Sequence, residues 1–118
     1  MPGMFRETAV KSVTIASGAA LSDAIDARDF SFLAVAMPSA WTAASIGFYV
    51  SSSLGGTFAP LYDDDGNLAQ IDSPAASKTY SAPAAIGAGH FVKLWSQNGS
   101  GTNTNQAAER ILVLHLKS

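Results

Sequence analysis

Apolar residues along this chain occur in short runs that alternate with polar positions or stop at glycine and proline. Every second side chain in residues 46–50 is large and apolar, and a lysine alternates with valine and leucine in residues 92–94. A period of two is typical of half-buried β-strands. Gly, Pro and Ser interrupt the alanine-rich segments, so no long stretch carries the 3.6-residue period of an amphipathic helix.

Nine segments have the length and composition of strands. They span residues 12–16, 20–25, 30–37, 46–51, 58–62, 68–71, 78–81, 91–96 and 111–116. Their spacing is close to the 8–12 residues that separate strands in sandwiches and barrels. We therefore expect an all-β fold, a two-sheet antiparallel β-sandwich of jelly-roll type with about eight or nine short strands. We assign residues 1–11 to an N-terminal arm and 12–118 to a single β-sandwich domain, with a short helical turn at 39–44.

Two of these segments are apolar on both faces. Leucines occupy one face of residues 111–116, and the other face carries Ile111, Val113 and His115; residues 32–37 are apolar throughout. A sandwich strand normally has one wet face, so each segment needs a second cover. Either the arm or a loop of the same chain supplies that cover, or another subunit does. We expect His115 to be packed within its apolar strand.

Low charge narrows the classes of partner. Only 14% of the 118 residues are charged and the formal net charge is −2, whereas soluble domains average about 25% charged residues. This balance argues against nucleic acid and anionic membrane as partners. The longest apolar run, residues 32–38, is too short to span a bilayer. Cysteine is absent, which excludes disulfides and favours synthesis in a reducing cytoplasm. A charge-poor surface suits contact with another protein.

One acidic motif is similar to the start of a metal-binding loop. Residues 63–67, Asp-Asp-Asp-Gly-Asn, match the start of a calcium loop. The match then fails, because Leu68 stands where the loop needs glycine and Pro74 where it needs a bidentate glutamate. A tight hairpin turn is the favoured interpretation. A weak calcium site built on Asp63 and Asp65 with remote ligands is the alternative.

Catalytic chemistry finds no complete constellation. His90 and His115 are the two histidines, and neither lies in a metal-binding spacing or near a nucleophile elbow. The aspartates gather in two clusters typical of solvated turns, so a small glycosidase is the least favoured hypothesis. We expect no enzymatic activity and no cofactor.

Aromatic and amide residues allow a glycan-binding interpretation. Trp41 and Trp95 could form a stacking platform, with Asn98, Asn103 and Asn105 contributed by the uncharged loop of residues 97–106. Core packing of the two tryptophans is the competing interpretation, since large aromatics are mostly buried.

Four segments carry a family resemblance. They are residues 37–44 (MPSAWTAA), 46–51 (IGFYVS), 61–66 (LYDDDG) and 105–110 (NQAAER). In this order they resemble small virion proteins of tailed bacteriophages and prophages, and the likeness runs from about Val13 to Leu116. The resemblance implies a β-sandwich on the virion, a capsid decoration (cement) protein without catalytic residues.

From the resemblance and the two-faced strands we expect a protein that binds the outside of the phage head and bridges capsomers. The expected contact residues are Met4, Phe5 and Arg6 in the arm, with Ile111 and Val113 on the last strand. The partner would be the major capsid protein, with a homodimer or homotrimer as an open alternative. The protein would be made in the host cytoplasm and end on the capsid surface. The competing function is a receptor- or glycan-binding module on a head fibre or tail.

Overall fold

The computed structural model describes residues 8–83 and 90–118, and these residues form nine β-strands joined by turns and loops, with no helix among them. The strands are β1 (Thr8–Ile15), β2 (Leu21–Asp26), β3 (Phe32–Ala36), β4 (Ser45–Ser51), β5 (Ala59–Pro60), β6 (Gln70–Ile71), β7 (Thr79–Ser81), β8 (Phe91–Gln97) and β9 (Arg110–Lys117). The all-β prediction, with about nine short strands, is confirmed. The helical turn expected at residues 39–44 is absent, because the N–H and carbonyl of Thr42 bond to the side chain of Gln106. None of the described segments is a helix that could span a bilayer.

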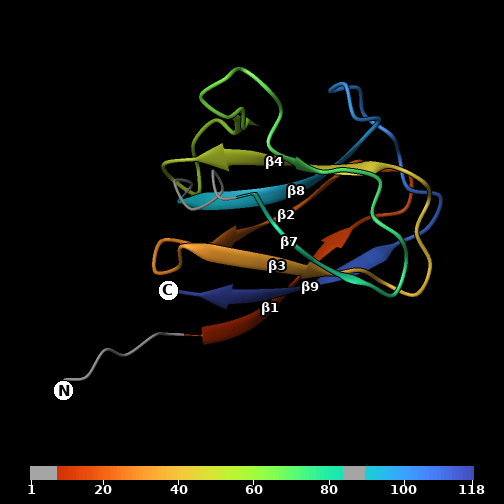
Figure 1. Ribbon diagram of the computed structural model, residues 1–118, viewed down its shortest axis with the longest axis horizontal. Coiled ribbons are helices and arrows are strands. Elements are labelled where there is room, and N and C mark those ends of the chain that lie inside the picture. Colours follow the sequence, from red (N-terminus) through yellow and green to blue (C-terminus); the bar gives the residue numbers. More distant parts are fainter. Residues whose placement is uncertain (1–7, 84–89) are drawn as a thin grey trace.

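All strand pairs are antiparallel and form one continuous, curled sheet. The order is β5-β4-β8-β2-β1-β9-β3-β7, and β6 also pairs with β4. Figure 1 shows β4, β8 and β2 on one side of the molecule and β3, β9 and β1 on the other. We call these the β8 half (β2, β8, β4, β5, β6) and the β9 half (β1, β9, β3, β7). Two separate jelly-roll sheets are not confirmed, because the pair Ile15↔Ser22 joins the two halves.

The sheet bends where β2 leaves β1. The two strands share a single register pair, and β2 carries a bulge between Leu21 and Ala24 where it crosses to β8. A bulge leaves backbone groups without ladder partners. Here side chains replace them: the Leu94 N–H donates to Ser22 Oγ at 2.9 Å, and the Thr14 N–H donates to Asp23 Oδ1 at 2.7 Å. Two polar residues within β2 therefore stabilise the turn from one half to the other.

One apolar core lies between the two halves. The β9 half contributes the alternate positions of its strands, and the β8 half contributes the alternate positions of β4 and β8. The buried members are Val13, Ile15, Leu33, Val35, Leu112, Leu114 and Leu116 from the first, and Ile25, Ile46, Phe48, Ile71, Val92 and Leu94 from the second. Because residues of both halves belong to one cluster, the sheet is folded over its own inner face.

The first strand begins earlier than expected. Residues 8–11, assigned to the N-terminal arm from the sequence, belong to β1 and pair with β9 from Thr8↔Lys117 onward. The long apolar strand β9 supplies a ladder partner along its whole length, so the short polar and apolar residues of this stretch are held in the sheet. Residues 1–7 lie outside the described residues.

Candidate functional site: an exposed sheet face

Side chains of the β9 half that point away from the core form aligned rows across the strands. The rows are Val10, His115, Ala34 and Ser81; then Ser12, Val113, Ala36 and Thr79; then Thr14 and Ile111. We call these rows the outer face. Val10 is 67% exposed and Ile111 is 51% exposed. Small residues between them, alanine, serine and threonine, leave the surface flat enough for another layer to pack against it.

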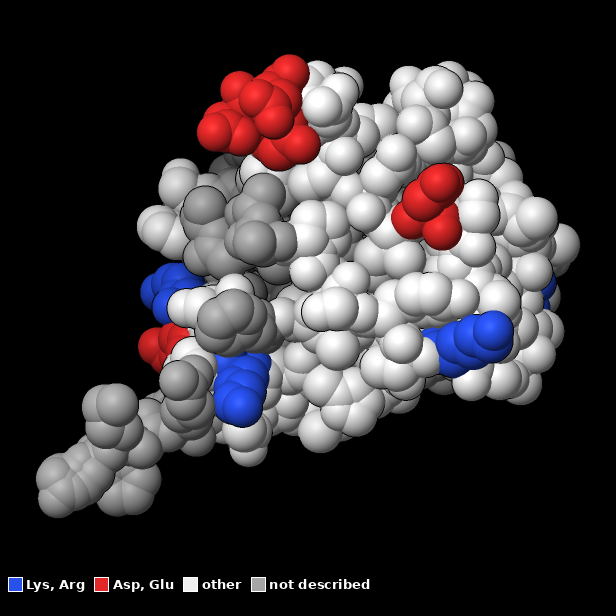
Figure 2. Space-filling view, viewed as in Figure 1, with Lys and Arg blue, Asp and Glu red and all other residues white. Residues whose placement is uncertain are grey.

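Charge is confined to the ends of the outer face. Two charged side chains of the β9 half are engaged in hydrogen bonds: Lys11 donates to the Asp26 carbonyl, and Arg110 donates to Gln106 and Thr42. Lys117 lies at one end of β9. Glu109 immediately precedes β9 at the other end. Figure 2 shows few charged residues over the side of the molecule in view: an acidic cluster lies at the top, basic and acidic groups lie near one another at the left, and wide uncharged areas separate them from the remaining charges. Few charges have to be desolvated when a protein docks on such a surface.

A hollow of about 550 Å³ occupies the Lys117 end of the outer face. Its lining includes Val10, Ala34 and His115 from the first row. His115 was expected to be packed within its apolar strand, but its side chain is exposed. The reason is the direction of β9: its leucines take the inner positions, so His115 faces outward between Val10 and Ala34.

The structure places the expected contact residues as follows. Ile111 and Val113 lie on the outer face, on neighbouring outward positions of β9. Met4, Phe5 and Arg6 lie outside the described residues. Val10 belongs to the same face and was missed, because β1 was expected to begin at residue 12. The alternation of Thr8, Val10 and Ser12 with inward residues is the signal that marks it.

The proposed glycan platform is not assembled. Trp95 is 2% exposed, its Nε1 donates to Asn103 Oδ1 at 2.6 Å, and its ring meets Tyr49 edge-on. Trp41 packs partly buried against the core and donates Nε1 to the Ala44 carbonyl at 3.1 Å. The enclosed ring of Trp95 offers no free face to a sugar.

Two of the three asparagines in the same loop form hydrogen bonds within the chain, and the third is exposed. Asn98 Oδ1 accepts the N–H groups of Ser100 and Thr102, and Asn103 is bonded to Trp95. Asn105 is exposed. The five expected glycan contacts are therefore spread between a tryptophan anchor, a local turn and the surface.

Two buried glutamines fix the loop of residues 97–106, and neither was among the residues expected from the sequence to form a site. Gln106 is fully buried; its Oε1 accepts from Thr42 and Arg110, and its Nε2 donates to Thr42 and Ser96. Gln97, also fully buried, accepts the N–H groups of Gly99 and Gly101 through Oε1. Nothing in an uncharged polar loop distinguishes such residues before the partners are known.

Residues 63–67 form the tight turn favoured from the sequence. Asp63 Oδ1 accepts the N–H groups of Asp65 and Asn67, Gly66 has a φ of 81°, and Tyr62 bridges to Leu68. Carboxylate oxygens of residues 63–65 come within 4.8 Å of one another. Their arrangement follows from the turn itself, since the Asp63 carboxylate is occupied by backbone donors.

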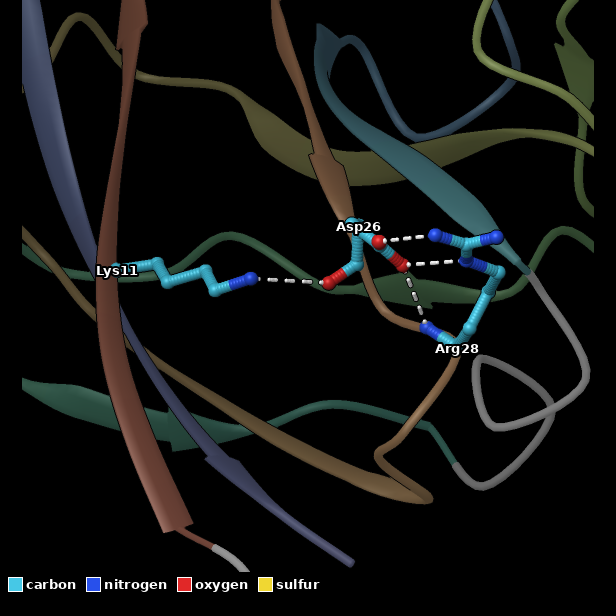
Figure 3. Close-up of polar contacts among 3 residues, drawn as sticks. All are labelled: Lys11, Asp26 and Arg28. Carbon is cyan, nitrogen blue, oxygen red and sulfur yellow. Dashed lines mark hydrogen bonds and ion pairs between the residues drawn. The ribbon is translucent and has the colours of Figure 1, made fainter.

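Asp26 and Arg28 form an ion pair at the end of β2. Arg28 donates Nε to Oδ1 at 3.0 Å and Nη2 to Oδ2 at 2.7 Å, and its backbone N–H donates to Oδ1 (Figure 3). These hydrogen bonds, the side-chain ones foremost, lower the pKa of Asp26 from 3.8 to about 2. Lys11 Nζ donates to the Asp26 carbonyl at 3.1 Å. The cluster therefore ties β2 to β1, and its carboxylate is too acidic to shuttle protons near neutral pH.

Comparison with known proteins gives a likeness of fold. No family model matches the sequence, and a search of curated proteins found no match. Among solved structures, the SPBc2 prophage-derived protein YomS superposes with a TM-score of 0.59 over 100% of this chain and 99% of that chain. The two sequences are 11% identical. The two chains thus share an all-β fold along their whole lengths.

Proposed function

We propose that this protein is a capsid decoration (cement) protein that binds the outside of a phage head and bridges capsomers. The observation that carries the proposal is the outer face of the β9 half. It combines exposed Val10 and Ile111 with small uncharged neighbours and has charge only at its ends. Such a surface is suited to protein contact, either with the shell or between subunits.

Two further findings support a virion role. The fold is shared end to end with a prophage-derived protein, YomS. The order of four sequence segments, from residues 37–44 to 105–110, resembles small virion proteins of tailed phages. The fold likeness and the segment order are separate observations, and both lead to phage proteins.

The proposed mechanism is repetition of weak contacts. A shell offers many identical sites, so a protein that engages two neighbouring capsomers gains avidity even where each contact is small. The partner is the major capsid protein, and neither nucleic acid nor membrane takes part. We propose no catalytic activity: the protein folds in the host cytoplasm and acts on the capsid surface.

A receptor- or glycan-binding role finds less support. It relies on Trp41 and Trp95 as a platform, and Trp95 is enclosed by Tyr49 and Asn103. A glycan site would have to use other residues, and no observation singles out a set.

The test is binding to purified heads that lack this protein, made from the major capsid protein encoded in the same genome. Full-length protein should cosediment with the heads in saturable, stoichiometric amounts. A variant lacking residues 2–7 and the variant Val113→Lys should each bind more weakly, whereas Leu54→Lys, at an exposed apolar residue outside the outer face, should bind normally. Heads that take up no full-length protein at saturating concentration would refute the decoration role.

A further inference from the structure

We propose that the outer face of the β9 half binds a second copy of this chain. In the proposed pair, two outer faces pack against each other about a two-fold axis that crosses β9 at Val113. The β9 strands of the two copies then run antiparallel, one over the other. The occupant is inferred from three properties of the described residues: a matched protrusion and hollow, matched charges, and the size of the face.

The register of the strands fixes which residues meet. A two-fold axis across β9 at Val113 sets the row of Ile111 in one copy over the row of His115 in the other. The same operation acts twice, because a two-fold interface is isologous and every contact occurs in duplicate. Val113 meets its own counterpart on the axis, and Ser12 of β1, its cross-strand neighbour, does the same.

A protrusion and a hollow are brought together by this operation. Ile111 is 51% exposed at one end of the outer face. The hollow of about 550 Å³ lies at the other end, around Val10 and His115. Superposing the two rows places each Ile111 over His115 at the edge of the hollow of the opposite copy. A surface that carries both the apolar knob and the space for it, at symmetric distances from one point, is complementary to itself.

The charged residues at the two ends of the outer face are also complementary under the same two-fold axis. Glu109 and Lys117 lie on opposite sides of Val113 at equal separation in sequence, and neither makes an ion pair within residues 8–83 and 90–118. Eight residues of extended strand separate them by roughly 27 Å, too far for attraction within one copy in physiological salt. In the pair, Glu109 of one copy meets Lys117 of the other at both ends. Such exposed ion pairs add little affinity, but they fix the relative orientation.

The size of the face sets the expected strength. Two strands of eight residues beside strands of five and three residues cover roughly 400 Å². A pair therefore buries roughly 800 Å² in total, below the range of stable interfaces and typical of weak, transient ones. We expect a reversible dimer with a Kd of about 10–100 µM, populated at high local concentration.

Sedimentation equilibrium of the purified full-length chain from about 5 to 500 µM tests the pair. We expect a monomer–dimer equilibrium that Ile111→Lys weakens by about tenfold or more, because a lysine ammonium would be placed at the edge of the hollow. The matched control is Leu54→Lys, which puts the same charge at an exposed leucine outside the face and should leave the Kd unchanged. A monomer over the whole range, a trimer, or equal dimerisation of Ile111→Lys and wild type would overturn the proposal.

A charge exchange tests the orientation without touching the apolar residues. Glu109→Lys and Lys117→Glu should each weaken the dimer by about two- to fivefold, since like charges then meet at both ends. The double variant should return to within about twofold of wild type, and 1 M salt should erase all these differences. If the double variant is weaker than either single one, the proposed orientation is wrong.

This inference goes beyond the decoration role and does not depend on it: it assigns the outer face to contact between subunits, so that a pair would meet the shell through other surfaces. Dimerisation is measured without capsids. A dimer that ignores heads would refute the decoration role alone, and a strict monomer that binds heads would refute the pairing alone.

Discussion

The outer surfaces of the two halves of the curled sheet differ: a loop of the same chain covers part of the β8 half, whereas the outer face of the β9 half stays exposed. On the β8 half, Trp95 lies across Gly47 and is covered by the loop that carries Asn103. A Cβ at Gly47 would come within 2.7 Å of the Trp95 ring, so glycine is required there. On the β9 half, Val10 and Ile111 stay exposed, and no described loop covers them.

This difference separates two uses of an apolar residue on the outside of a strand. A residue that the chain itself covers stabilises the monomer, because its burial is part of folding. A residue left open adds nothing to folding and is available to a partner. The covered side uses a large ring held by polar loop residues, whereas the open side uses small side chains with two protruding ones. Substitutions on the two sides should therefore move different observables.

The largest expected effect is on the covered side. Trp95→Ala should destabilise the monomer by about 3–5 kcal/mol, because it removes a buried aromatic side chain and leaves a cavity. Ile111→Ala, on the open side, should change the free energy of unfolding by less than about 0.5 kcal/mol. Urea denaturation followed by tryptophan fluorescence for Ile111→Ala, and by circular dichroism for both variants, measures this. Equal losses would contradict the comparison.

A smaller effect is expected from the glutamine that holds the cover. Gln106→Ala removes four side-chain hydrogen bonds and leaves the Thr42 N–H and carbonyl without them. The expected cost is about 2–3 kcal/mol, from buried polar groups left unpaired. Asn105→Ala, at the exposed neighbouring position, is the matched control and should cost less than about 0.5 kcal/mol. Hydrogen exchange of the Thr42 amide should rise in the first variant only.

The smallest effect concerns the ion pair of Asp26 and Arg28 at the end of β2. The pKa of Asp26 is about 2 in the folded protein, below its usual 3.8. The unfolded chain therefore binds more protons between these values, so the stabilisation is present above about pH 4 and is lost as the pH falls towards 2. Asp26→Asn should flatten the dependence of the urea midpoint on pH in this window. Asp64→Asn, in the exposed turn, should follow wild type; a parallel profile for Asp26→Asn would exclude this source.

Local pattern predicted the strands well but not how the outer surfaces are used. Alternation put Leu112, Leu114 and Leu116 on one face of the strand and Ile111 and Val113 on the other, because side-chain direction in a strand has a strict period of two. The same rule puts Trp95 on the outward side with Lys93, where a sugar platform was considered. The ring is nevertheless buried, since the loop that returns over it is fixed by long-range hydrogen bonds that local pattern does not encode.

Two other differences have the same origin. The start of β1 at Thr8 depends on the ladder with β9, which is more than ninety residues away in sequence. The continuity of the sheet depends on Ser22 and Asp23, whose side chains replace backbone partners at the bend. Short polar residues give no sign of such roles before the strands are paired.

The position of Thr8 has a consequence for reach. The chain enters the sheet at the Lys117 end of β9, so in the proposed pair the two entry points lie at opposite ends, roughly one strand length of 27 Å apart. The pair would therefore present any group attached at the start of β1 twice, at two points separated by about one strand length. Two copies of such a group would engage a repetitive surface at high effective concentration.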